Sequence, residues 1–366
     1  MQSFRNLADG EIALPAVGMV LVGRNGHGKT SFLEALLYPE VFRSFRGARE
    51  RDLARFGADG FRVEVGTEAR AHGDTGAQGH GRTGAREDGR TVAAGYDART
   101  RTKRVTVDGL VAERLADAIG VVRGVVLSPF DAELVAGAPR ERRRFLDVLL
   151  ALTVPGYVGA LAQFTRAMRQ RSRATAAEMA VWESMVARPG AAIAAARRVW
   201  AGTWAERYRG CCAAMGERGV PGLAYHAGGP DEPAELEAAL ARSRERDLAR
   251  GHAGVGPHRD DLRLTLDGRV LRTYGSAGQQ RTAAIALRLV EAEALAEARG
   301  EPPAVCLDDA FAELDAERSA RLGGMVSDLL AHGSQVFATV PREGDMPAAV
   351  RELPRWRIED GALARG

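Results

Sequence analysis

The chain of 366 residues is poor in cysteine and in long apolar runs, and each shortage excludes a class of protein. Its three cysteines, Cys211, Cys212 and Cys306, are too few and odd in number for a disulfide framework, so a reducing compartment is expected. No apolar run reaches the roughly 18 residues that a membrane-spanning helix needs, and no signal peptide is recognisable. The sequence therefore predicts a cytoplasmic protein with no membrane partner.

Lysine is also scarce, since Lys29 and Lys103 are the two lysines among 51 basic side chains. Where arginine is used almost everywhere else, a lysine indicates a position that needs a compact, flexible charge. The remaining composition is ordinary, with 45% hydrophobic residues, 27% charged residues and a net charge of +3. It predicts one large or two medium globular domains.

Lys29 lies in a phosphate-binding pattern. Residues 23–30 read Gly-Arg-Asn-Gly-His-Gly-Lys-Thr and fit G-x-x-x-x-G-K-[ST], after an apolar run at 17–22 and before a helical pattern from residue 31. In this context backbone N–H groups and the helix N-terminus bind phosphates, the lysine reaches the β and γ phosphates, and the Thr30 hydroxyl ligates Mg²⁺. The alternative is a chance glycine turn before a helix. The predicted ATP-binding residues of this stretch are Asn25, Gly26, His27, Gly28, Lys29, Thr30 and Ser31.

An acidic pattern near residue 308 supplies the second half of such a site. Residues 304–307 are apolar and end in Asp308 and Asp309, as a Walker B strand does. Asp308 is expected to hold Mg²⁺, directly or through water, and Asp309 to polarise the attacking water. Lys29 and Asp309 are therefore the predicted catalytic residues. Because aspartate has a shorter reach than the more usual glutamate, slow hydrolysis is expected.

Residues 275–281 open a predicted helix with small residues, a serine and exposed N–H groups, which suit an anion. Taken alone, this stretch is more simply interpreted as an N-capped structural helix. The order of the patterns favours the functional interpretation. A P-loop, a serine-glycine helix start, an Asp-Asp strand and then residues 312–315 follow one another in the ABC-type ATPases.

Composition divides the chain into two lobes. Residues 60–110 alternate apolar and polar side chains and predict an antiparallel meander, in which the Gly-rich segment 66–90 is expected to be a flexible loop. Residues 136–251 have helical spacing and predict a helical lobe, without sustained heptads, inserted between 1–135 and 252–366. The predicted fold class is α/β, an ABC-type ATPase head with a mixed P-loop sheet and the meander, plus the inserted helical lobe.

The chain resembles the RecF family of the Rad50/SMC-like ABC ATPases over nearly its full length. The P-loop is generic, whereas three stretches are more particular to that family, namely residues 142–147, 256–262 and 278–282. Other matching residues are Phe4-Arg5-Asn6, Phe32 to Ala35, Arg43 to Arg46, Leu127 to Pro129 with Asp131, Leu307 to Asp309 and Glu313 to Asp315.

The resemblance implies a head-to-tail dimer that encloses ATP between two copies of the chain. Arg5 and Asn6 would flank the base and ribose, and Asp315 of the D-loop would lie at the dimer interface. The signature residues of one copy would contact the γ-phosphate held by Lys29 of the other copy; they are Ser276, Gly278 and Gln279.

The resemblance also implies an activity and partners. The implied activity is a weak, DNA-stimulated hydrolysis of ATP. The implied DNA partners are double-stranded DNA and single/double-strand junctions or gaps. The protein would act with RecR and RecO to load the recombinase RecA in DNA repair, replication and the SOS response. Phe130 departs from the family pattern, because it stands where an acid is usual. Thr339 stands where ABC transporters carry a switch histidine, which the family often lacks, so γ-phosphate sensing is expected to differ from that of the transporters.

Arginine-rich helical segments could follow a DNA backbone in a salt-sensitive manner with little sequence readout. In a chain so rich in arginine the alternative is a solvated face, because acids such as Glu141 interleave. The stretch 258–261 could form a metal or acid/base set, although a polar hinge is the simpler interpretation. The candidate DNA contacts are Arg142, Arg143, Arg144, Arg169 and Arg171.

Three other functions remain open. A transporter-type ATPase subunit predicts a gap of about 100 residues between P-loop and signature, the size of one compact domain, whereas here the gap contains a whole helical lobe. A Rad50- or SMC-like head with a different client needs long heptads. The third alternative is a nucleotide-gated binding module that does not hydrolyse ATP. The effect of Asp309→Asn on single-turnover ATP hydrolysis distinguishes it from an ATPase.

Overall fold

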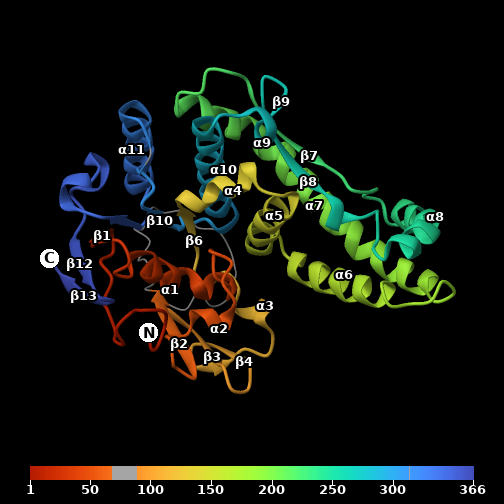
Figure 1. The fold of residues 1–366 in the computed structure, drawn as a ribbon, viewed down its shortest axis with the longest axis horizontal. Helices are drawn as coiled ribbons and strands as arrows, with labels where there is room; N and C mark the ends of the chain where they lie inside the picture. Colours follow the sequence, from red (N-terminus) through yellow and green to blue (C-terminus); the bar gives the residue numbers. More distant parts are fainter. Residues whose placement is uncertain (68–88, 313) are drawn as a thin grey trace, which may run out of the picture. The chain divides into compact units, whose positions relative to one another are not determined.

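The structure, a computed structural model, describes residues 1–67, 89–312 and 314–366, which divide into two compact units (Figure 1). The first unit comprises Met1–Gly124, Phe337–Met346 and Leu353–Gly366, and the second comprises Val125–Val336 and Pro347–Glu352. Within the described ranges no helix combines the length and apolarity that crossing a membrane requires.

The first unit carries a sheet around strand β1 (Gly18–Val22), which is buried at all five positions. Such a continuous apolar run is typical of a strand covered on both faces. Strand β12 (Arg355–Glu359) pairs with β1 in parallel, and β13 (Ala362–Arg365) pairs with β12 in the antiparallel direction. Strand β11 (Val336–Val340) is the other neighbour of β1. The glycine loop leaves this sheet at residue 23.

A second sheet of the same unit is an antiparallel meander in the order β2-β3-β4-β5, as predicted. Its strands are β2 (Gly60–Thr67), β3 (Arg90–Asp97), β4 (Thr102–Val107) and β5 (Leu110–Val111). The ends of the Gly-rich segment predicted as a loop, residues 66–67 and 90, belong to β2 and β3. Residues 68–88 of this segment lie outside the described residues.

Helix α1 (Lys29–Val41) follows the glycine loop and is buried along most of its length. The Phe61 ring packs edge-on against Phe4, with centroids 5.2 Å apart, and against Tyr38, at 5.3 Å. This aromatic cluster fixes the N-terminal segment to the helix, because edge-to-face ring pairs prefer defined orientations. The short helices of the unit are α2 (Glu50–Leu53), α3 (Leu115–Ala118) and η3 (Glu343–Asp345).

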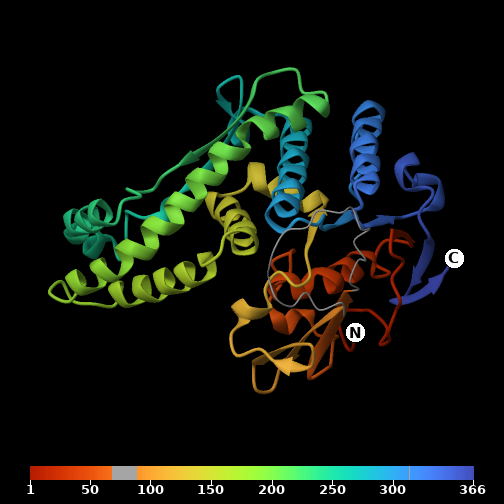
Figure 2. The ribbon, with the colours of Figure 1, turned by 180° about the vertical axis from the view of Figure 1, so that it is seen from behind.

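The second unit is mainly helical. Helices α6 and α7 run side by side, and α8 packs on α7 (Figures 1 and 2). Its helices are η1 (Pro129–Asp131), α4 (Ala132–Ala136), α5 (Pro139–Thr153), α6 (Tyr157–Arg171), α7 (Met179–Ala214), α8 (Pro233–Arg250), η2 (Pro257–Arg259), α9 (Leu271–Tyr274), α10 (Ala277–Arg299), α11 (Ala316–Ala331) and η4 (Ala348–Val350).

Five strands also belong mostly to this unit. Strands β6 (Gly124–Leu127) and β10 (Ala304–Asp308) are sheet neighbours. An antiparallel sheet has the order β7-β8-β9, formed by β7 (Pro221–His226), β8 (Asp261–Leu266) and β9 (Arg269–Val270).

The bounds of the two units differ from the lobes expected from composition, which were 1–135 with 252–366, and 136–251. Helix α10 packs against α4, α5 and α7, so much of the chain after residue 252 clusters with the helical segment. Composition gives no information on this packing, because the apolar face of an amphipathic helix does not specify its neighbour.

Candidate nucleotide-binding site

The glycine loop of the first unit has the backbone geometry of a phosphate-binding turn. Gly26 has φ of 87° and Gly28, the N-cap of α1, has φ of 108°. Residues with a side chain rarely adopt these angles. The Lys29 side chain is 5% exposed, and its Nζ donates to Gly23 O at 2.8 Å and to Asn25 Oδ1 at 3.2 Å. The ammonium is thus directed into the loop, where it can meet a phosphate.

Asn6 connects the middle of the loop to the first turn of α1. Its Nδ2 donates to Gly26 O at 3.0 Å, and its Oδ1 accepts from Ser31 Oγ at 3.0 Å. The turn between β12 and β13 contributes as well, since the Gly361 N–H donates to His27 O at 3.0 Å and the Asp360 N–H donates to His27 Nδ1 at 3.1 Å. Several segments distant in sequence therefore fix the shape of the loop.

Arg5, expected beside the base, is engaged by a buried acid. Its Nε and Nη2 donate to the two carboxylate oxygens of Glu34, at 2.9 and 3.2 Å, and its Nη1 donates to Asp52 O at 2.9 Å. Glu34 has no exposed surface, and it also accepts from the Ser44 hydroxyl. Sequence reasoning assigned no role to Glu34 or Ser44, although a carboxylate within the apolar run 32–37 was a usable signal.

The acidic pair predicted near residue 308 lies at a strand end of the second unit. Asp308 closes β10 and is 2% exposed. Asp309 follows with φ of 46°, a left-handed conformation that aspartate adopts more readily than most residues. The regular strand geometry therefore ends at Asp308.

The predicted signature and D-loop residues lie at two helix starts of the same unit. Ser276 caps α10 in a reciprocal box, in which the Gln279 N–H donates to Ser276 Oγ at 3.3 Å and the Ser276 N–H donates to Gln279 Oε1 at 3.0 Å. Asp315 caps α11 by accepting the Arg318 N–H at 2.8 Å. Glu313, which the resemblance included, lies outside the described residues.

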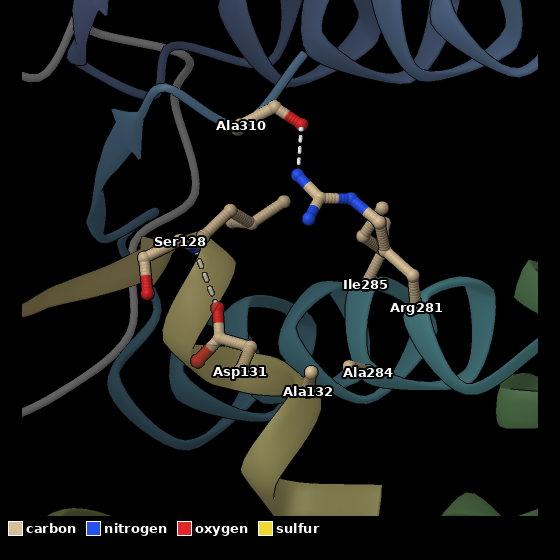
Figure 3. Close-up of a pocket in the computed structure, with 8 residues that line it drawn as sticks. Ser128, Asp131, Ala132, Arg281, Ala284, Ile285 and Ala310 are labelled. Carbon is tan, nitrogen blue, oxygen red and sulfur yellow. Dashed lines mark hydrogen bonds between the residues drawn. The ribbon is translucent and has the colours of Figure 1, made fainter. Parts of the chain in front are cut away.

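Ser128 and Asp131, which flank Phe130 in the sequence, line a junction with Arg281 of α10 (Figure 3). The Ser128 N–H donates to Asp131 Oδ2 at 2.7 Å, and Arg281 Nη2 donates to Ala310 O at 3.2 Å. The cavity between these groups measures about 10 Å³, room for one water molecule at most. This junction is packed protein rather than a ligand pocket.

Arg288 of α10 holds the other oxygen of Asp131. Its Nε and Nη2 donate to Asp131 Oδ1 at 2.9 and 2.8 Å, and its Nη1 donates to Glu291 at 2.7 Å. Burial raises the pKa of Glu291, although Arg288 acts in the opposite direction. This ion-paired cluster fixes α10, and so the signature, to the segment that follows β6.

Two of the predicted DNA contacts, Arg142 and Arg171, have buried side chains, which disfavours their contact with DNA. Arg142 is 4% exposed and donates from Nε and Nη2 to Asp261 at 2.7 and 3.1 Å. Arg171 is 2% exposed and pairs with Glu183 at 3.0 Å and Asp247 at 2.9 Å. Guanidinium groups held inside the protein cannot reach a phosphate backbone.

The other three candidates differ in exposure. Arg143 is half-buried and donates to Asp260 O at 2.6 Å, Arg144 is half-buried, and Arg169 is exposed. Arg169 is therefore the candidate best placed to meet a polyanion.

The stretch 258–261 belongs to a buried hydrogen-bond network. Asp260 is 1% exposed and accepts from Arg197 at 2.7 Å, from the Tyr225 hydroxyl at 2.6 Å and from the Gly228 N–H at 2.7 Å. Burial lowers the pKa of His258, whose Nε2 lies 3.0 Å from Ala253 O. No group of three potential metal-binding side chains occurs in the described part of the chain. The hydrogen bonds of this network are structural. They favour the polar-hinge interpretation of the stretch over a metal site.

The fold and these motifs define an ABC-type ATPase head of the SMC-like kind. The chain is 35% identical to the DNA replication and repair protein RecF of Anaeromyxobacter dehalogenans (strain 2CP-C) over 378 residues, which cover 100% of this chain and 97% of the relative. RecF of Frankia alni is 33% identical, with 99% and 97% covered. The chain therefore belongs to the RecF family of DNA replication and repair proteins. No family model matches it.

Solved structures agree with this assignment. A structure described as the recombination mediator protein RecF-ATP in the RecFOR pathway superimposes with a TM-score of 0.86 at 25% identity, covering 100% of this chain and 95% of that one. An Smc head domain from Pyrococcus furiosus, at 15% identity and a TM-score of 0.57, shares the fold.

Proposed function

We propose that this protein binds ATP with Mg²⁺ and hydrolyses it slowly at a site that a second copy of the chain completes. The observation that carries the proposal is the glycine loop, with positive φ at Gly26 and Gly28 and the buried Lys29 ammonium directed into it. Backbone N–H groups and a helix N-terminus at such a loop bind phosphates.

The residue types of the two predicted motifs suit a magnesium nucleotide. Mg²⁺ prefers oxygen ligands and is usually held by one or two carboxylates together with water and substrate phosphates. The Thr30 hydroxyl and the Asp308 carboxylate are the residues that would hold it. The ion would neutralise charge that develops on the phosphates. Asp309 would orient the attacking water, and Lys29 would neutralise the γ-phosphate.

The signature and D-loop support a site shared between two copies. Ser276 is exposed, and the Asp315 side chain is 57% exposed, so both can meet a second molecule. The positive end of the α10 dipole at Ser276 to Gln279 favours an anion held by the partner. ATP bound between two copies would stabilise the dimer, and hydrolysis would release it.

We further propose that the dimer acts on DNA as a recombination mediator. The support is membership of a family of DNA replication and repair proteins and the likeness to a protein described as a recombination mediator in the RecFOR pathway. Gapped or junction DNA and partners of the RecO and RecR type are proposed on the same ground, with DNA stimulating hydrolysis. Arg169, Arg143 and Arg144 remain the candidate contacts.

Sedimentation with and without ATP and Mg²⁺ tests the nucleotide part. The wild-type chain should dimerise with ATP, Lys29→Ala should stay monomeric, and Asp309→Asn should dimerise without hydrolysing. Lys103→Ala removes the other lysine charge, which donates to Phe42 O at 2.7 Å rather than to the glycine loop, and should still dimerise with ATP. An ATP-independent oligomeric state in the wild type would overturn the shared site.

Binding to a gapped duplex at increasing salt tests the DNA part. Electrostatic contact with phosphates predicts that log K falls linearly with the logarithm of the salt concentration. Binding that does not change with salt would argue against contacts made by arginine.

A further inference from the structure

The Arg318 guanidinium lies next to the signature, although Arg318 belongs to none of the motifs recognised in the sequence. Arg318 is in the first turn of α11, and its backbone N–H is capped by Asp315 at 2.8 Å. The Arg318 side chain runs back toward the start of α10. It thereby connects the D-loop and the signature, which are 39 residues apart when counted from Ser276 to Asp315.

The contact with the signature is made at Gly278. A Cβ atom added to Gly278 would lie 2.6 Å from Arg318 Nη1 and 3.6 Å from its Cζ. Real Cβ atoms do not approach other atoms so closely. Glycine at this position therefore leaves the space that the Arg318 head group occupies, and a Cβ there would displace this flexible end of the side chain.

The charge of Arg318 is only loosely neutralised. Its pair with Asp315 measures 3.6 Å from Nη1 to Oδ2, and the Arg318 side chain is 28% exposed. Arg288, by contrast, donates twice to Asp131 at 2.9 and 2.8 Å. An ion pair at the longer distance, with an acid that is 57% exposed, is weak and screened. Arg318 can therefore exchange Asp315 for a more strongly charged anion.

We propose that Arg318 binds the nucleotide phosphates held by the partner copy, beside Ser276 and Gly278. This inference rests on the proposed shared site and adds a residue to it. A guanidinium matches phosphate oxygens with paired N–H donors and is always charged. Its position next to the signature backbone places this charge on the face that the partner's triphosphate would meet. Release of Asp315 would accompany ATP binding.

Mixing two defective variants tests whether Arg318 acts across the dimer. Arg318→Ala keeps its own glycine loop, and Lys29→Ala keeps its own Arg318. A mixed dimer then contains one composite site with Lys29 from the first variant and Arg318 from the second. Each variant alone should hydrolyse ATP at least tenfold more slowly than the wild type. The mixture should regain a substantial part of the wild-type rate.

Two further measurements separate binding from folding. Arg318→Ala should bind ATP as a monomer with unchanged affinity and unfold at the wild-type temperature, but need at least tenfold more ATP to dimerise. Arg318→Lys should recover part of this loss. Arg321→Ala is the control, because Arg321 lies on the same helix but pairs with Glu317 at 2.6 Å and donates to Ala214 O at 3.2 Å, away from the signature, and should dimerise with ATP as the wild type does.

The possible failures are distinguishable. If the wild type does not dimerise with ATP, the proposed function is wrong. If the wild type dimerises and Arg318→Ala matches it, only the role of Arg318 is wrong. If Arg318→Ala is defective and a mixed dimer that sedimentation detects at saturating ATP regains no hydrolysis, Arg318 acts within its own copy and the inference is overturned.

Discussion

The guanidinium of Arg5 forms a two-point ion pair with the carboxylate of Glu34, at 2.9 and 3.2 Å. Glu34 lies on the helix that follows the glycine loop and has no exposed surface. The N-terminal segment is therefore attached to the base of the phosphate-binding turn by a buried charge. Asn6, the next residue, contacts the loop itself at Gly26.

Glu34→Gln should destabilise the fold and weaken ATP binding together. Removing one partner of a buried pair typically costs about 3 kcal/mol, because the remaining charge is left uncompensated. Urea unfolding and fluorescent-nucleotide titration would measure the two effects. Glu64→Gln is the control, since Glu64 pairs with Arg62 at the surface and should change neither quantity. Unchanged ATP affinity in Glu34→Gln would mean that the pair does not support the loop.

Two replacements of Asp309 should separate chemistry from backbone strain. Both Asp309→Asn and Asp309→Ala should lower single-turnover hydrolysis by about 100-fold, the usual contribution of a positioned base. Because φ at this position is 46°, only the alanine variant should also lose about 1 kcal/mol of stability. Thermal unfolding and phosphate release measure the two effects. Undiminished hydrolysis in the asparagine variant would show that another group activates water.

Arg169 and Arg171 lie two residues apart on α6 and should respond in opposite ways to alanine. Arg171 is 2% exposed between two acids, so Arg171→Ala should cost about 3–5 kcal/mol of stability. Arg169 is exposed, so Arg169→Ala should change stability by less than about 0.5 kcal/mol.

The DNA affinity of the Arg169→Ala variant gives the second readout of this pair. Loss of one phosphate contact should reduce the slope of log K against log salt by about 0.9. An unchanged slope would place the DNA-binding face elsewhere.

The cysteines should be almost unreactive in the native protein. Burial raises the pKa of Cys211 to about 11 and that of Cys212 to about 12. Cys306 has no exposed surface. Since the thiolate is the reactive form, a raised pKa lowers the reactivity of a thiol at neutral pH. At pH values below the pKa, the rate of thiol labelling should therefore increase about tenfold for each unit by which the pH is raised.

Thiol titration with a chromogenic disulfide checks this prediction. Three thiols should react in denaturing urea, and almost none should react in the native protein at pH 8. Rapid native labelling at that pH would contradict the burial of the Cys211-Cys212 end of α7.

Much of the candidate site followed from sequence because its parts are continuous in the chain. An apolar strand, a glycine loop and a helix predict the phosphate-binding turn by local rules alone, and residues 304–309 predict a buried strand that ends in two acids. The antiparallel meander at 60–110 followed from period-two alternation. In each case neighbours in sequence are neighbours in space, so a pattern of a few residues is sufficient.

The partners of individual charged side chains did not follow from sequence. Arg142, Arg169 and Arg171 looked alike in an arginine-rich pattern, yet two of the three are buried against acids from other segments. Helical spacing tells which residues share a face, but it does not tell which face packs inward when both carry arginine. The compact units have other bounds than the predicted lobes, since the packing of α10 on α7 joins segments far apart in the chain.

The sequence by itself determined the class of protein, because the nucleotide-binding motifs are short, local and rare in combination. The tertiary structure decided which side chains support those motifs. Glu34 meets Arg5 from 29 residues away, and Arg318 reaches Gly278 from the start of another helix. Such contacts arise from how the elements pack, and the energy of packing depends on all the neighbours of a side chain at once.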